Sequence, residues 1–101
     1  MTLQTISELL KATGLPVAYR AFKERQDPPF ICYLVVNSNN FFADDSVYFP
    51  VNRLQIELYT SDKDPETEKK LEMALQGLCW EKSESLIESE QIYQITYEIE
   101  V

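Results

Sequence analysis

The sequence has 101 residues and a formal net charge of −8 at pH 7, with 45% hydrophobic and 26% charged residues. This length suits one domain with one buried core. An acidic surface repels phosphate, so the charge argues against a domain that grips nucleic acid electrostatically. The charge is uneven, because residues 1–50 sum to −1 and residues 51–101 to −7.

The first third of the chain predicts a helix and two strands. Apolar residues at helical spacing predict a short helix that starts at Thr2 and ends before Gly14. The stretch PVAYRAF predicts a first strand at Val17–Phe22, and KERQDPP predicts a loop after it. FICYLVV, residues 30–36, is apolar on both alternating faces, which is typical of a covered strand in the middle of a sheet.

The next stretch, NSNNFFADDSVYFP, breaks this apolar run with polar residues and four aromatic rings. It exceeds the loop of about two to five residues that joins most hairpin strands, so we expect a protruding hairpin near residues 37–50. Aromatic rings at its tip would suit an interface, because each buries a large area at low entropy cost. Alternatively, the rings fold back onto an uncovered sheet face and form a second small core.

The second half predicts a strand, a helix and two further strands. In VNRLQIELYT, residues 54, 56 and 58 alternate with Arg53, Gln55, Glu57 and Tyr59, which predicts one packed face and one available face. A helix is expected after an Asp64 cap, with Pro65 at its first position. Its buried stripe would be residues 71, 74, 75 and 78, with Glu68 as a surface charge. Strands near 85–88 and from 91 to 101 follow.

These elements predict a single α+β domain over residues 1–101. In the order α-β-β-β-α-β-β, two helices would flank a mostly antiparallel or mixed sheet. If the helices cover one face, the other is free for association.

No motif in the sequence indicates catalysis or a cofactor. The chain has no histidine, no GxSxG nucleophile motif and no P-loop, so we expect neither an enzyme nor catalytic residues. Cys32 and Cys79 lack metal-site spacing, and we expect both to be buried, reduced thiols. Asp44 and Asp45 are adjacent acids without further ligands, which favours a solvated turn over a metal site.

The sequence also lacks targeting signals. The stretch MTLQTISELLKATG has no basic region followed by an apolar core and a cleavage site, so no signal peptide is expected. No apolar run approaches the roughly 20 residues of a membrane span. We therefore expect the chain to remain in the cytosol until it joins a larger assembly.

Four stretches together resemble a known family: GLPVAYRAF, DPPFICYLVVNSNNFFADDSVYF, LQIELYTSDKDPETEKKLE and IESEQIYQITYEIEV. They resemble the tail terminator family of long-tailed bacteriophages and prophages, also called tail completion or tail-to-head joining proteins. Within them, PPF.CY, ADD..Y and IELYT..KD are the most distinctive parts.

The resemblance implies a non-enzymatic virion subunit without cofactors. Such subunits commonly assemble as a six-membered ring on the tail tube, stop tube growth and meet the head connector protein. The resemblance also implies a mixed α/β fold with a protruding hairpin. DNA would pass without specific binding, and the protein would move from the bacterial host cytoplasm to the tail-head junction of the virion.

Contact residues are inferred from this sequence rather than from the family. Aromatic residues on the hairpin would anchor a neighbouring ring subunit or the last tube ring, and the flanking acids would set register. The candidates are Phe41, Phe42, Asp44, Asp45, Tyr48 and Phe49 on the hairpin, with Arg53, Glu57 and Tyr59 on the available sheet face. Candidates for a lumen that repels DNA are Glu88, Glu90, Glu98 and Glu100.

Two other functions fit the same composition. A head-tail connector subunit between portal and tail would also form a ring, with different partners. An acidic inhibitor that mimics DNA would need acids along one continuous surface, whereas many acids here alternate with apolar residues or sit beside lysines.

Overall fold

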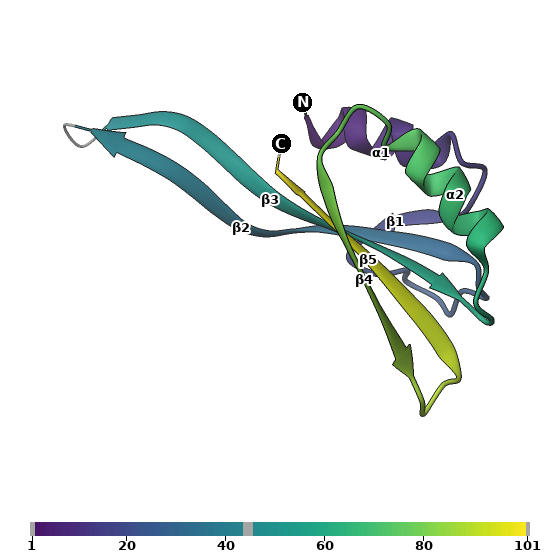
Figure 1. The fold of residues 1–101 in the computed structure, drawn as a ribbon. Helices are drawn as coiled ribbons and strands as arrows, with labels where there is room; N and C mark the ends of the chain where they lie inside the picture. The colour runs from purple at the N-terminus through teal and green to yellow at the C-terminus, as the bar shows by residue number, and fades with distance from the viewer. Residues whose placement is uncertain (1, 44–45, 101) are drawn as a thin grey trace.

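The computed structural model describes residues 2–43 and 46–100, and for residues 37–43 and 46–52 it describes the backbone. Two helices and five strands in this part confirm the α+β class and the element order (Figure 1). The helices are α1 (Leu3–Lys11) and α2 (Pro65–Ala74), and the strands are β1 (Val17–Tyr19), β2 (Phe30–Ala43), β3 (Ser46–Thr60), β4 (Trp80–Ile87) and β5 (Ile92–Glu100).

The sheet is mixed, with the strand order β1-β2-β3-β5-β4. Strand β1 runs parallel to β2, and every other neighbouring pair is antiparallel. The FICYLVV strand was expected in the middle of the sheet, but the centre is β3. Strand β2 is still internal, because β1 pairs with its outer edge.

Both helices begin where side chains can satisfy their first free N–H groups. The Thr2 hydroxyl accepts from the Thr5 N–H at 3.1 Å, and the Asp64 carboxylate accepts from the Thr67 N–H at 3.2 Å. Pro65 occupies the first turn of α2, as predicted. After the helix, Gly77 has a φ of 91°, which a glycine adopts without steric cost.

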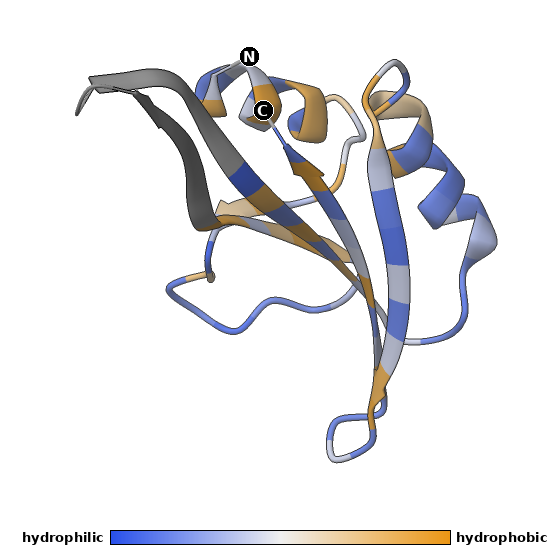
Figure 2. Ribbon diagram, turned by 60° about the vertical axis from the view of Figure 1, so that its left-hand side comes forward, coloured by the Kyte–Doolittle hydropathy of each residue, from blue (hydrophilic) through white to orange (hydrophobic). Residues whose placement is uncertain are grey.

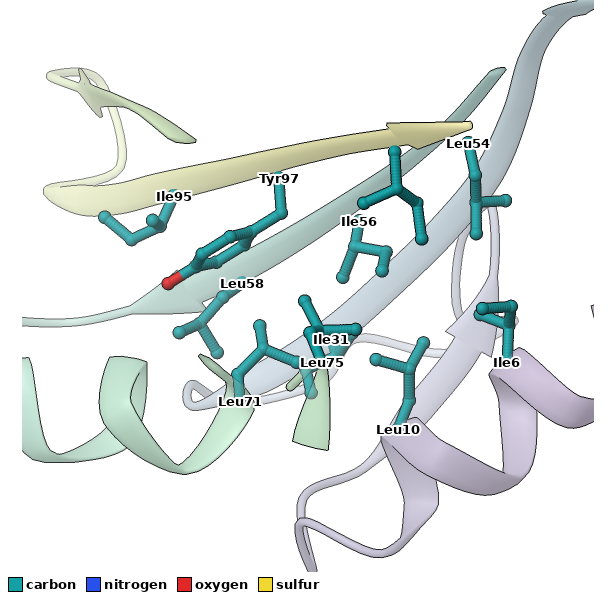
Figure 3. Close-up of a cluster of buried hydrophobic side chains, with 11 residues drawn as sticks. Ile6, Leu10, Ile31, Leu54, Ile56, Leu58, Leu71, Leu75, Ile95 and Tyr97 are labelled. Atoms are coloured by element: carbon teal, nitrogen blue, oxygen red, sulfur yellow. The ribbon is translucent and has the colours of Figure 1, made fainter. Parts of the chain in front are cut away.

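The core lies between the two helices and one face of the sheet (Figure 3). Helix α1 contributes Ile6 and Leu10, and α2 contributes Leu71 and its C-cap residue Leu75, all fully buried. The sheet residues beneath them are Ile31, Leu54, Ile56, Leu58, Ile95, Tyr97 and Ile99. Each fully buried aliphatic side chain stabilises the fold by about 1.5–3 kcal/mol. The opposite face of the sheet has no helix, and we call it the helix-free face.

Two strand boundaries differ from the prediction. Strand β1 ends at Tyr19 rather than Phe22, because Arg20 has a φ of 66° and turns the chain out of the sheet. Strand β4 starts at Trp80 rather than near residue 85. The Trp80 ring packs edge-on against Tyr97 at 5.2 Å between centroids, which anchors the start of an edge strand whose residues 81–85 are all polar or charged.

Strands β2 and β3 continue beyond the sheet as a two-stranded hairpin, which confirms the predicted protrusion (Figure 1). We call residues 37–43 and 46–52 the arm. Among residues 2–43 and 46–100, β5 pairs with β3 from Arg53 onward, and the arm strands pair with each other alone. Pro50 lies in this part of β3, which is consistent with the edge positions where a missing N–H is tolerated.

Glu68 contradicts the prediction of a surface charge. Its side chain is 3% exposed, and its two carboxylate oxygens lie 2.8 Å from Lys63 Nζ and 2.7 Å from Lys82 Nζ. Burial alone would raise the pKa of Glu68, but the contacts with the two lysines outweigh it and hold the pKa below its ordinary value of 4.5. The ionised carboxylate thus links α2 to β4.

We expect Glu68→Gln to lower the free energy of unfolding by about 2–3 kcal/mol at pH 7, because breaking a buried ion pair leaves its partners uncompensated. Because the pKa of Glu68 is lower in the folded state than in the unfolded state, the ionised carboxylate stabilises the fold above about pH 4.5. This stabilisation is lost as the pH falls through the folded-state pKa. The difference from the native chain should therefore shrink toward pH 3 in urea unfolding. Glu66→Gln, an exposed change in the same helical turn, is the control and should cost less than about 0.5 kcal/mol. Equal losses for the two variants would contradict the buried role of Glu68.

Candidate interaction surface

The helix-free face carries the sheet residues that sequence periodicity predicted to be available. Arg53, Glu57 and Tyr59 alternate along β3 with buried core residues and lie on this face, half-buried by their neighbours. Across the ladder, Glu57 pairs with Thr96 and Tyr59 with Gln94 of β5. The structure thus brings the three candidate residues together on one strand.

Glu57 is the centre of a hydrogen-bond network on this face. One carboxylate oxygen accepts from the side-chain amides of Gln55 at 2.8 Å and Gln94 at 2.9 Å. The other accepts from the Tyr59 hydroxyl at 3.2 Å. Burial, followed by the charge of Glu57, raises the pKa of Tyr59, so the phenol stays protonated and remains a donor at neutral pH. These hydrogen bonds hold the four side chains together on the helix-free face.

The end of the face nearest the arm is acidic. Glu98 pairs with Arg53 at 2.7 Å, and Glu100 lies 3.9 Å from the same guanidinium. Glu81 lies opposite Glu98 in the β4–β5 ladder. We call Arg53, Glu81, Glu98 and Glu100 the acidic end. A cavity of about 420 Å³ opens here, and its lining also includes Cys79, Trp80 and Ile99.

The other end of the face is covered by the loop between β1 and β2, residues 20–29, which we call the basic loop. Phe22 packs edge-on against Phe30 at 5.5 Å, and Phe30 stacks on Tyr59 at 4.8 Å. Figure 2 shows this mostly hydrophilic loop on the opposite side of the sheet from the helices. Its exposed cations are Arg20, Lys23 and Arg25. Sequence reasoning missed this contact, although an aromatic residue within a charged loop was a usable signal.

The backbone ladder places the hairpin candidates along the arm. Phe41 lies opposite Phe49, and Phe42 lies opposite Val47, so Tyr48 is an extra residue without a ladder partner. Such an irregularity bends and twists a two-stranded ribbon. Asp44 and Asp45 lie outside the described residues. The hairpin candidates therefore lie on the arm, whereas Arg53, Glu57 and Tyr59 lie further along β3, where that strand belongs to the main sheet.

The four acids suggested for a lumen do not form one patch. Glu98 and Glu100 belong to the acidic end, whereas Glu88 and Glu90 lie beside the β4–β5 turn at the other end of β5. Within residues 2–43 and 46–100, no three His, Cys, Asp or Glu side chains gather as metal ligands would. In the same residues, no helix has the length and apolar character needed to cross a membrane.

No protein-family model matches the chain, and no curated protein has significant sequence similarity to it.

The two cysteines occupy different environments, which corrects the expectation that both are buried. Cys32 is 4% exposed on the helix-free face beneath the basic loop, whereas Cys79 is exposed beside Trp80. Burial and the charge of Glu57 raise the pKa of the Cys32 thiol to about 11.

We therefore expect iodoacetamide at pH 8 to alkylate the native protein once, at Cys79, because Cys32 is both covered and protonated. Peptide mass spectrometry would locate the label, and both thiols should react in 6 M guanidinium chloride. Cys79→Ser should leave the native protein unlabelled on the same timescale. Labelling of native Cys32 at the rate of Cys79 would contradict the packing of the basic loop on the sheet.

Proposed function

We propose that this chain is a non-enzymatic subunit of a phage tail-head junction, a tail terminator that assembles as a ring of six copies on the tail tube. There it ends tube growth and joins the tail to the head connector. The observation that supports this proposal most directly is the arm. The chain segments that resemble the tail terminator family include most of the arm, up to Phe49.

The arm has the properties of an assembly device. Each of its strands contributes seven residues, which at about 3.3 Å per residue corresponds to a projection of roughly 20 Å. It also accounts for the long dimension of a molecule that measures 50 × 27 × 24 Å (Figure 1). A two-stranded ribbon is marginally stable in water by itself. An arm of this length, rich in aromatic residues, gains stability when a partner buries it.

A ring also needs two different surfaces on each subunit, because its interfaces are heterologous. The arm supplies one surface, and the body of the domain supplies the others. In this proposal, Phe41, Phe42, Tyr48 and Phe49 anchor the arm on a neighbouring ring subunit or on the last ring of the tube. Asp44 and Asp45 set its register.

The placement of the acids favours a ring subunit over an acidic inhibitor that mimics DNA. Glu68 and Glu72 pair with Lys82, and Lys63 pairs with Glu68 and Glu84. On the other face, Arg53 pairs with two more acids. Cations therefore interrupt the acidic surface in the described part of the chain, whereas a DNA mimic requires an unbroken row of negative charge. A connector subunit would use the arm in the same way on a different partner.

We expect the double variant Phe41→Ala with Phe42→Ala to fold but to fail in assembly, because the arm loses the apolar area that a partner would bury. The readouts are the thermal unfolding midpoint and complementation of a phage or prophage that lacks the intact gene. The matched control is Met73→Ala with Leu86→Ala, which removes two exposed apolar side chains outside the arm.

Three results are informative. Normal folding with lost complementation supports the arm as an anchor. Normal complementation would contradict it. A double variant that unfolds would show instead that the two rings belong to a core, as in the alternative drawn from the sequence.

A further inference from the structure

We propose that adjacent copies in the ring also meet head to tail through the helix-free face, with the acidic end of one copy receiving the basic loop of the next. This interface is separate from the arm. The inference rests on the proposed ring, and the occupant of the face is a second copy of this chain.

The acidic end offers negative charge beyond what its own cation neutralises. Glu81, Glu98 and Glu100 surround a single guanidinium, that of Arg53, which leaves a net charge of −2 at this end. Arg53 is engaged most closely by Glu98, so Glu81 and Glu100 are the carboxylates that face outward, and Glu100 is 54% exposed.

The basic loop offers the complementary charge. Residues 20–27 carry Arg20, Lys23 and Arg25 against Glu24 and Asp27, a net charge of +1 in a chain of −8. All three cations are exposed, and none forms an ion pair with another described residue. The stacked rings of Phe22, Phe30 and Tyr59 hold the loop on the sheet.

Arg20 has an unusual backbone conformation that places it at the start of this loop. Its φ of 66° lies in the left-handed region, which residues with a side chain rarely adopt. Hydrogen bonds from Arg20 N–H to the Tyr33 carbonyl at 2.9 Å and from Ala21 N–H to the Tyr19 carbonyl at 2.8 Å maintain it. Glycine would fit this position with less strain, so an arginine here points to a use for the guanidinium.

Geometry makes the contact intermolecular. The acidic end lies at Arg53, whereas the loop packs on Tyr59, six residues further along β3 and about 20 Å away. The two ends of one copy therefore cannot meet each other. Two unlike patches at opposite ends of one face can pair head to tail, which gives the heterologous contact that the proposed ring requires.

Charge reversal in two complementary variants tests this interface. The acid-reversed variant is Glu81→Lys with Glu100→Lys, and the base-reversed variant is Lys23→Glu with Arg25→Glu. The matched control is Glu8→Lys with Glu66→Lys, two exposed acids on the helices that cover the other face. Each protein is first checked by its thermal unfolding midpoint. It is then incubated with tail tubes purified without the terminator, and capped tubes are counted by negative-stain electron microscopy.

We expect each reversed variant alone to cap tubes about tenfold less well than the native chain and the control. An equimolar mixture of the two should restore capping, because alternate copies then present opposite charges at every contact. Normal capping by either single variant, or no recovery in the mixture, would overturn the interface while leaving the proposed function intact. If the native chain caps no tube and forms no ring, both proposals are wrong.

Arg20→Gly gives a second measurement that does not depend on a reversed charge. Glycine accepts the left-handed backbone, so this variant should unfold no earlier than the native chain. Capping should nevertheless fall several-fold at low salt, and the deficit relative to the native chain should shrink as salt is raised, since the ion pair that the variant lacks is itself screened. Full capping by Arg20→Gly would count against the role of the basic loop.

Discussion

Strand β3 buries Leu54, Ile56 and Leu58 against the helices, and this alternation fixes the register of the strands beside it. A slip of one residue would turn Glu57 into the core and expose the three aliphatic side chains, at a cost of several kcal/mol. The same register places Arg53 and Tyr59 on the helix-free face. Because β2 pairs along the whole of β3, it also determines which residues face each other in the arm. The core, the polar face and the arm are thus set by one strand.

The two halves of β3 have different physical roles. From Arg53 onward it is a central strand with neighbours on both sides, whereas before Arg53 it is an edge strand that contains Pro50. The boundary coincides with the acidic end, where Arg53 pairs with Glu98 and Glu100 of β5. The proposed tube or ring contact through the arm and the proposed contact between neighbours through the helix-free face therefore begin at the same place.

Periodicity in the sequence was enough to predict the element order, the faces of β3 and the start of α2 at Asp64. It failed where distant residues decide the outcome. Glu68 is buried between Lys63, which lies just before the same helix, and Lys82 of β4, and the helical pattern around Glu68 does not reveal the second of these contacts. The early end of β1 depends on the positive φ of Arg20, which its residue type does not predict. On the candidate surface, alternation identified Arg53, Glu57 and Tyr59, whereas the packing of the basic loop required the tertiary structure.

The proposed role of the chain is to end tail growth and to join the tail to the head. Its most direct test is negative-stain electron microscopy of particles made when this reading frame is interrupted in its phage or prophage, with complementation by the intact gene. We expect abnormally long tails without heads, and tails of normal length after complementation. Tails of normal length beside unattached or emptied heads would assign the chain to the connector instead. Fully joined, infectious particles would contradict a role in virion assembly.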